Sequence, residues 1–299
     1  MDEQDWLVDR FEEHRTHLKA VAYRMLGSVA DAEDAVQESW LRVSRAGAGE
    51  VENLGAWLTT IVARVCLNML RARKTARELD ATRSARSVSG TDRADPEEEA
   101  LLADSVGLAL LVVLDRLVPA ERLAFVMHDM FDLPFEEIAQ VLGRSPAAAR
   151  QLASRARRRV RGAVPASGRD RARQREVVEA FLTATRTGDF QGLMAVLDPE
   201  VVLRADPSAV PRGAETVLHG APAVVAAARA YAGFARFTQI VLVNGGAGLL
   251  VAPRGRLMRV LTFRVVGGRI VGIDVIADPD RLPDLDLAML GRAAGGAGS

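Results

Sequence analysis

The sequence has one cysteine, two lysines and few aromatic residues. The shortage of cysteine and the lack of a long apolar run exclude several classes of protein. A single cysteine, Cys66, excludes a disulfide scaffold and a cysteine-rich zinc site. The longest apolar run, Gly107–Leu114, is far shorter than the about 20 residues that cross a bilayer. Residues 1–15 are acidic and polar, unlike the basic and then apolar order of a signal peptide. We therefore expect a cytoplasmic protein without a membrane segment.

The formal net charge of the chain is zero, but acidic and basic residues are distributed unevenly along it. The 299 residues are 49% apolar and 26% charged, an ordinary globular composition with room for two or more domains. Residues 1–40 hold ten acids against four bases, whereas residues 142–175 hold eleven arginines against one aspartate. This asymmetry indicates two partners, one met by an acidic face and one by a basic face.

Apolar periodicity predicts that the first half of the chain is helical. The expected helices are Trp6–Leu26, Asp31–Val43, Asn53–Arg73, Glu98–Leu117, Ala120–Met130, Phe135–Leu142 and Pro146–Arg161. Residues 74–99 have almost no large apolar side chains, and residues 162–169 contain proline and glycine. We interpret both segments as linkers.

The last third of the chain has the pattern of an α+β domain. Helices are expected at Arg171–Thr187 and Ala221–Tyr231, and strands at Val201–Asp206, Phe237–Val243, Leu257–Val266 and Arg269–Ile276. Gly267 and Gly268, between the last two strands, predict a tight hairpin. We expect one curved antiparallel sheet with helices, followed by a partly disordered tail over residues 283–299.

The strongest local pattern lies in residues 135–161. A short amphipathic helix ends at Gly143, Ser145 can cap the next helix, and Pro146 can take its first position. This is the layout of a helix-turn-helix, whose second helix reads the major groove of DNA. Its polar face carries Arg150, Ser154, Arg157 and Arg161. A solvated basic helix in a bundle is the alternative, and the cap and turn favour DNA.

Two earlier helices also carry polar faces. The helix at Asn53–Arg73 presents Trp57, Thr60, Arg64, Asn68 and Arg71 on one side. An aromatic side chain among arginine and asparagine is typical of surfaces that hold unstacked bases, although Trp57 alone would equally suit packing. The helix at Asp31–Val43 presents acids that either form a solvated face or dock a basic protein.

Three segments, in this order and spacing, resemble a known family. They read ADAEDAVQESWLRV, NLGAWLTTIVARVCLNMLRARK and PAERLAFVMHDMFDLPFEEIAQVLGRSPAAARQLASRARRRV. They are similar to conserved regions 2 and 4 of extracytoplasmic-function (ECF) sigma factors, the bacterial RNA polymerase subunits that choose promoters. Residues 171–282 resemble a SnoaL-like domain of the NTF2-like cone fold. That fusion points to the SigJ-type subgroup, in which the extra domain acts as a regulator.

The resemblance implies a domain order. Region 2 would occupy residues 1–74, a flexible linker 75–99, the region 4 helix-turn-helix 100–162 and the SnoaL-like domain 170–282. The chain would be an alternative sigma factor whose partners are core RNA polymerase and promoter DNA, with its activity modulated by the SnoaL-like domain.

The resemblance also assigns roles to residues. Core polymerase would be bound by Asp31, Asp34, Gln37 and Glu38. The −10 element would be read by Trp57, Thr60, Arg64, Asn68 and Arg71, with a flipped base captured by the loop Ser44–Glu52. The −35 element would be read by Arg150, Gln151, Ser154, Arg155, Arg157 and Arg158.

One late segment matches a signature of the family's extra domain, and it consists of Asp278, Pro279, Asp280, Arg281 and Leu282. We expect a regulatory contact here, because Pro279 and Pro283 would keep the segment extended as a docking strap. Capping of the sheet edge is an equally supported interpretation.

Two other functions stay open at this point. A one-component helix-turn-helix regulator with a ligand-sensing domain would need neither the acidic helix nor the Trp57 helix. A cyclase- or isomerase-like enzyme could use Asp206, His219 and Asp274 in a cone pocket, with Asp274 pointing inwards, but we favour a protein that is not an enzyme. Glycine-rich nucleotide motifs and histidine clusters are absent from the sequence, so we expect no cofactor and no metal. A small-molecule ligand of the C-terminal domain stays open.

Overall fold

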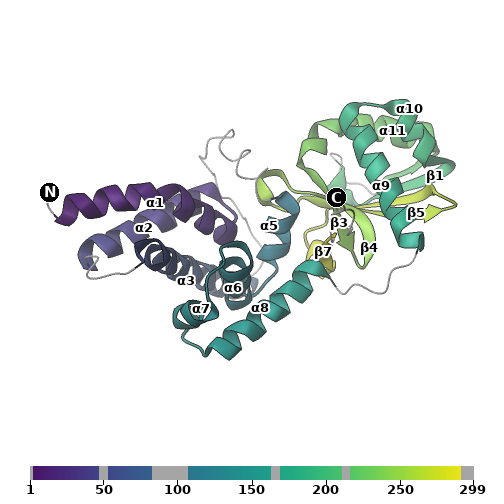
Figure 1. Ribbon diagram of the computed structural model, residues 1–299. Coiled ribbons are helices and arrows are strands. Elements are labelled where there is room, and N and C mark those ends of the chain that lie inside the picture. The colour runs from purple at the N-terminus through teal and green to yellow at the C-terminus, as the bar shows by residue number, and fades with distance from the viewer. Residues whose placement is uncertain (1–2, 47–52, 83–106, 163–168, 211–215, 291–299) are drawn as a thin grey trace, which may run out of the picture. The chain divides into compact units, whose positions relative to one another are not determined.

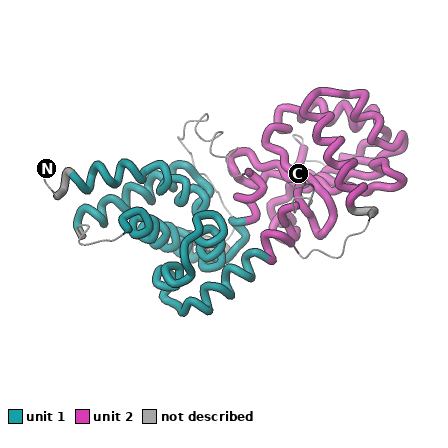
Figure 2. Tube along the Cα trace, viewed as in Figure 1, with its two compact units in different colours: residues 1–106, 114–157 teal, residues 107–113, 158–299 magenta. Residues whose placement is uncertain are grey.

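The computed structural model describes residues 3–46, 53–82, 107–162, 169–210 and 216–290. It divides into two compact units, which Figure 2 distinguishes by colour. Unit 1 contains residues 1–106 and 114–157, and unit 2 contains residues 107–113 and 158–299. Unit 1 is helical, whereas unit 2 combines helices with one sheet (Figure 1). The predicted fold class, helical segments followed by an α+β domain, is confirmed.

Unit 1 begins with three packed helices, α1 (Glu3–Leu26), α2 (Val29–Ala46) and α3 (Leu54–Thr82). Their shared core includes Phe11, Leu18, Leu58 and Val62. Helix α3 was expected to end at Arg73, and the linker to begin there. The structure instead continues the helix to Thr82, because residues 74–82 contain neither proline nor glycine and several good helix formers. The remaining part of the predicted linker, residues 83–99, lies outside the described residues.

The second half of unit 1 contains the short helices of the predicted helix-turn-helix. They are α6 (Pro119–Phe125), the π-helix η1 (Val126–Met130), α7 (Phe135–Leu142) and most of α8 (Pro146–Arg161). Helix α3 packs against α6 and α7, and α1 packs against η1. The two helical segments that we expected as separate domains therefore share one unit, because their apolar faces pack on each other.

Arg122 of α6 lies in the packing between these two helical segments. Its side chain is only 2% exposed, and it donates to Oδ1 of Asp115 at 3.2 Å and to the carbonyl oxygen of Arg24 in α1 at 3.4 Å. Burial lowers the pKa of the Arg122 guanidinium, which Asp115 partly opposes. A buried cation between two helices gives this packing a defined geometry rather than a general apolar contact.

Unit 2 is built on a seven-stranded sheet of order β2-β1-β6-β5-β4-β3-β7. The strands are β1 (Leu197–Ala205), β2 (Thr216–His219), β3 (Thr238–Val243), β4 (Gly246–Val251), β5 (Arg259–Val266), β6 (Arg269–Ile276) and β7 (Leu287–Met289). All neighbouring pairs are antiparallel except β1 and β6, which pair in parallel, so the expectation of a purely antiparallel sheet is wrong for that pair. The predicted hairpin is confirmed: Gly267 and Gly268 take φ values of 60° and 83° between β5 and β6.

Three strands and one helix of unit 2 escaped prediction: β2, β4, β7 and α10 (Phe190–Val196). Strand β4 contains glycines at 246 and 248, and glycine weakens the sequence pattern of a strand; a Cβ on Gly248 would lie 2.7 Å from the carbonyl oxygen of Leu261. Strand β7 falls in the segment that we expected as a tail, and it pairs with β3 from Val241 to Val243. Residues 291–299 lie outside the described residues.

The core of unit 2 lies between the sheet and the helices α9 (Arg169–Thr187), α10 and α11 (Ala221–Ala230), seen in Figure 1. Val178 and Phe181 of α9 pack with Leu249, Phe263 and Ile273 of the sheet. The sheet strands have bulges near Leu197 and Arg264, which bend a sheet locally. Helix α5 (Leu108–Asp115) begins in this unit as well. Among the helices of the described ranges, none is long and apolar enough to cross a membrane.

Candidate nucleic-acid and partner interfaces

The turn between α7 and α8 has the geometry that the sequence predicted. Gly143 is left-handed, with φ 64° and ψ 41°, and its N–H together with that of Arg144 donates to the last carbonyls of α7. Oγ of Ser145 accepts from the N–H of Ala148 at 3.2 Å, so Ser145 caps α8 and Pro146 follows at its first position. The two helices of the motif thus begin and end at the residues expected.

Helix α8 separates apolar and basic side chains as its period requires. Its buried face consists of Ala149, Leu152, Ala153, Ala156 and Val160. The predicted −35 residues Arg150, Gln151, Ser154, Arg155 and Arg158 are exposed, and Arg157 is half-buried. Small alanines let the helix lie close to its scaffold, so the opposite face is left to solvent or to a ligand.

Three of those arginines have acidic neighbours that sequence reasoning missed. Arg150 pairs with Glu136 at 2.9 Å, Arg155 with Glu121 at 3.2 Å and Arg157 with Asp129 at 2.5 Å. The pair Arg150–Glu136 is exposed on both sides, so it holds Arg150 only weakly. Glu121 is buried, so its pair positions Arg155 more firmly, whereas the pair of Arg157 with Asp129 lies at the surface. No periodicity in the sequence marks such pairs, since they join separate elements.

The predicted −10 residues lie along α3. Arg64, Asn68 and Arg71 form an exposed stripe at spacings of four and three, whereas Trp57 and Thr60 are half-buried at the start of the helix. A guanidinium nitrogen of Arg64 lies 3.5 Å from the carbonyl oxygen of Gln140 in α7. One end of the stripe therefore contacts the helix-turn-helix within unit 1. The base-capturing loop was expected at 44–52, and its residues 47–52 lie outside the described residues.

The acidic residues of α2 divide into two kinds. Asp34, Gln37 and Glu38 are exposed, and Glu38 pairs with Arg42 one turn along the same helix at 3.1 Å. Asp31 is instead half-buried and forms an ion pair with Arg73 of α3, so it fastens α2 to α3. The exposed acidic face is consequently narrower than the sequence suggested.

The only cysteine of the chain, Cys66, belongs to helix α3. Cys66 is fully buried in α3, and burial raises the pKa of its thiol to about 12. A neutral, inaccessible thiol is a packing residue and takes no part in a redox or nucleophilic site.

The segment Asp278–Leu282 does not have the extended form that its prolines suggested. The N–H groups of Arg281 and Leu282 donate to the carbonyl oxygen of Asp278, and Asp280 N–H donates to the Asp278 carboxylate, so the chain turns tightly. Pro279 and Pro283 fit such turns, since a fixed φ near −65° serves turns as well as extended chain. One carboxylate oxygen of Asp206 accepts from the N–H groups of Ala277 and Asp278 at 2.8 and 2.9 Å, which ties the segment to the sheet.

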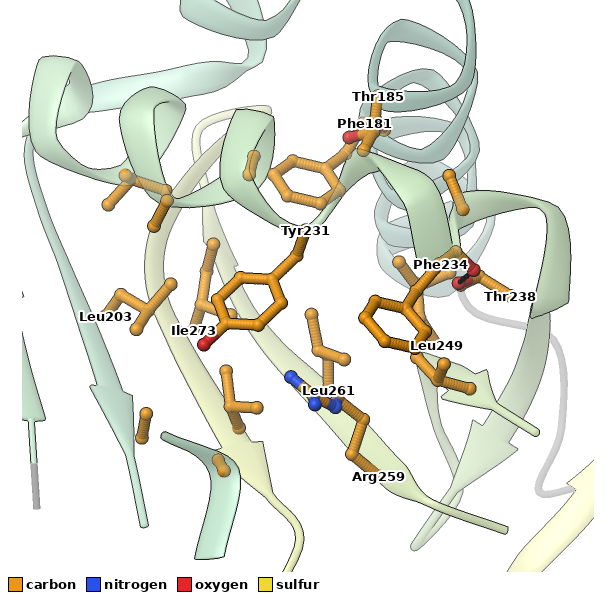
Figure 3. Close-up of a pocket in the computed structure, with 18 of the residues that line it drawn as sticks. Phe181, Thr185, Leu203, Tyr231, Phe234, Thr238, Leu249, Arg259, Leu261 and Ile273 are labelled. Carbon is orange, nitrogen blue, oxygen red and sulfur yellow. Dashed lines mark hydrogen bonds between the residues drawn. The ribbon is translucent and has the colours of Figure 1, made fainter. Parts of the chain in front are cut away.

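The residues considered for catalysis are not brought together. Asp206 binds the backbone described above, His219 is exposed at the end of β2, and Asp274 is exposed. The expectation that Asp274 points inwards is wrong, because Ile273 and Val275 line the cavity of unit 2 and Asp274 faces the other side of β6. That cavity is instead lined mostly by apolar side chains, together with three threonines, Tyr231 and Arg259 (Figure 3).

Comparisons with known proteins agree across most of the chain. Sigma-70 region 2 matches residues 10–76, and sigma-70 region 4 matches residues 107–160. The ECF RNA polymerase sigma factor SigJ of Mycobacterium tuberculosis is 38% identical over 290 residues, which cover 92% of each chain. The probable ECF RNA polymerase sigma factor SigI of the same organism is 34% identical over 292 residues, 95% of this chain and 98% of the relative. The crystal structure of SigJ covers 92% of this chain and 98% of its own, with 35% identity and a TM-score of 0.45.

Proposed function

Because this chain belongs to the ECF RNA polymerase sigma factors, and is therefore an alternative sigma factor, we propose that it binds core RNA polymerase through α2 and promoter DNA through α3 and α8. Asp34, Gln37 and Glu38, with Asp31 behind them, would contact polymerase. The exposed stripe from Arg64 to Arg71, with Trp57 and Thr60 at its start, would read the −10 element.

The observation that carries the promoter proposal is the division of α8 into two faces. Its alanine-rich face is buried, and the capped first turn directs Arg150, Gln151 and Ser154 to solvent. In a helix-turn-helix, residues near the start of the second helix reach base edges, and arginine is the side chain that binds guanine in a bidentate manner. Arg155, Arg157 and Arg158 complete the basic face and would position the helix on phosphates.

Promoter binding requires unit 1 to open. The position numbers of the −10 and −35 elements differ by 25, which corresponds to about 85 Å of B-DNA at about 3.4 Å per base-pair step. In the structure α3 packs directly on α6 and α7, and Arg64 contacts Gln140. We infer that this packing is a resting arrangement, from which the two helical segments separate when polymerase is bound.

The C-terminal domain is proposed to modulate this activity through region 4. The match to sigma-70 region 4 covers residues 107–160, and residues 107–113 of this stretch lie in unit 2. There the N–H of Ala109, in the first turn of α5, donates to Oε1 of Gln239 in β3 at 2.8 Å. The domain would thus hold one end of region 4. The segment Asp278–Leu282 is kept as a second proposed regulatory contact, and the cavity of the domain as the place of a small-molecule ligand.

Run-off transcription with core polymerase tests the sigma role at its polymerase face. The charge reversals Asp34→Lys and Glu38→Lys should together abolish most promoter-specific transcript while leaving the thermal melt unchanged, since exposed charges contribute little to stability. Asp9→Lys, a reversal at an exposed acid of α1, is the matched control and should transcribe normally. Transcription by the double variant at the level of the control would refute the proposed polymerase contact. Promoter-specific opening without core enzyme would refute the sigma role.

A further inference from the structure

Unit 2 contains a cavity that takes no part in the proposed contacts with polymerase and promoter DNA. It lies between the sheet and the helices α9 and α11, with the 3-10 helix η3 (Ala232–Phe237) closing one side. Its volume is about 130 Å³. An apolar cavity of about 150 Å³ is known to hold benzene, so the space suits one ring or a short branched chain.

The walls of this cavity are mostly apolar, and five of the strands each contribute two alternate residues to them. Strand positions two apart share one face of a sheet, which is why Leu249, Leu261 and Ile273 all point to the same side. Phe181 of α9 and Ala228 of α11 form the opposite wall. Three threonines also line the cavity, and the hydroxyls of Thr185 and Thr238 already donate to the backbone carbonyls of Phe181 and Phe234. Most of the lining can therefore offer a ligand only apolar contact.

Arg259 is the exception, and it stands at the first position of β5, on the same side as Leu261. Its guanidinium lies between two rings, 4.9 Å from the centroid of Tyr231 and 5.6 Å from that of Phe234 (Figure 3). The Nε atom is buried and has no hydrogen-bond partner among the described residues. Arg259 also forms no ion pair with a described acidic residue. The chain holds as many acidic as basic residues, so acidic residues are not scarce overall.

Arg259 is half-buried, and its buried Nε–H meets no acceptor among the residues that the structure describes, which is an unfavourable arrangement for the protein alone. Ring contacts offset part of the lost hydration of the cation, but they do not satisfy an N–H donor. A planar carboxylate is the group that matches the donors of a guanidinium, because it can accept two parallel hydrogen bonds. As far as the described residues show, the site thus presents a mostly apolar chamber of the size of one ring, with one arginine in its wall that has no acidic partner among them.

We propose that this cavity binds a small apolar carboxylic acid, with the carboxylate on Arg259 and the hydrocarbon part among Phe181, Leu249 and Leu261. The inference rests on the proposed ligand-binding role of the C-terminal domain and names the chemical class of that ligand. An aromatic acid of one ring fills the available volume, and the rings of Tyr231 and Phe234 would cover its charged end from water.

The experiment is calorimetric titration of the full-length protein with benzoate and with benzamide, which is nearly the same shape but uncharged. Benzoate should bind at least about tenfold more tightly, because only the anion forms charge-assisted hydrogen bonds with Arg259. Arg259→Met should remove this preference while keeping weak binding of benzamide. Arg264→Met, at an exposed position of the same strand, is the matched control and should retain it.

The outcomes separate this inference from the broader one. Equal binding of benzoate and benzamide would overturn the carboxylate assignment and leave an apolar ligand site standing. If neither benzoate nor benzamide bound, both the carboxylate assignment and the apolar ligand site would be overturned. If Arg264→Met lost the preference for benzoate as fully as Arg259→Met, the anion would bind at the surface, and this result would overturn the proposal that it binds in the cavity. Ala228→Leu, which fills the cavity from α11, should weaken both probes if they enter it, and thermal melts of every variant check that the domain is folded.

Discussion

Phe131 directly follows the π-helix η1, and its substitution tests the proposed resting arrangement of unit 1, in which the two helical segments are packed together (the closed state). Its ring meets the ring of His17 edge-on, with centroids 5.3 Å apart, and the guanidinium of Arg24 lies 5.0 Å from its centroid. Both partners belong to α1, so the substitution Phe131→Ala removes contacts between the two helical segments. The backbone turn is held independently by the N–H of Leu133, which donates to the carbonyl oxygen of Met127.

The magnitude follows from the two contacts. An edge-to-face ring pair contributes about 0.5–1.5 kcal/mol, and a partly buried cation–ring contact about 0.5–2 kcal/mol. Phe131 is half-buried, so the lost apolar burial adds little. A loss of about 2 kcal/mol from the closed state would raise the ratio of open to closed molecules about 30-fold. Transcription should rise with it until opening no longer limits the rate.

Opening is measured by energy transfer between dyes on cysteines introduced at Glu12 in α1 and at Arg144 in the turn before α8, both exposed. Cys66 is buried and should not be labelled. All three tryptophans, Trp6, Trp40 and Trp57, belong to unit 1, so their fluorescence reports whether the variant is folded. Val8→Ala, an exposed position of α1, is the control. A folded Phe131→Ala protein with unchanged dye distances and unchanged transcription would refute the resting arrangement.

Three other predictions concern the DNA face, the turn at Asp206 and the buried thiol. Arg150→Ala should cost about 1–3 kcal/mol on the cognate −35 sequence and relax preference at one base pair, whereas Arg161→Ala should weaken all sequences alike and lower the salt dependence; equal behaviour of the two in competition binding would exclude base reading by Arg150. Asp206→Ala should lower the unfolding free energy of unit 2 by about 1–3 kcal/mol because two partly buried N–H groups lose their acceptor, and Asp274→Ala should change it by less than about 0.5 kcal/mol; similar melting temperatures would contradict this. Burial raises the pKa of the Cys66 thiol from 9.0 to about 12, so its contribution to stability is complete below pH 9.0 and is lost as the pH rises towards 12, by about 1.4 kcal/mol per unit. Urea unfolding at about pH 8 and about pH 10.5 should show a smaller loss in Cys66→Ala than in the parent chain, and equal losses would be evidence against it.

The sequence predicted best what is decided locally. Helices α7 and α8 begin and end where the glycine, the serine cap and the proline indicated, and β6 was placed by its hairpin glycines. The buried and exposed faces of α8 followed from its period. Strands β2, β4 and β7 escaped because short or glycine-containing strands are stabilised by their neighbours, and β7 forms only where β3 offers an unpaired edge.

The candidate site residues likewise include some features that local periodicity predicts and others that depend on contacts between distant segments. Periodicity showed which side of α3 carries Arg64, Asn68 and Arg71, but it could not show that Arg64 reaches Gln140, a residue 76 positions along the chain. Asp31 was grouped with the exposed acids by its spacing, yet its partner Arg73 belongs to another helix. Arg259 carried no signal at all, because an arginine at the start of a strand becomes distinctive only when a cavity and two rings surround it.

Helix α8 contains six arginines and no lysine. Acetylation, which neutralises lysine, therefore cannot alter the charge of this helix, and methylation of arginine would keep it. A guanidinium also stays protonated at every physiological pH. The arginine charge of this face is thus insensitive to acetylation and to the pH of the cell, so we expect control over when the promoter is bound to act on the accessibility of the helix and on its distance from α3.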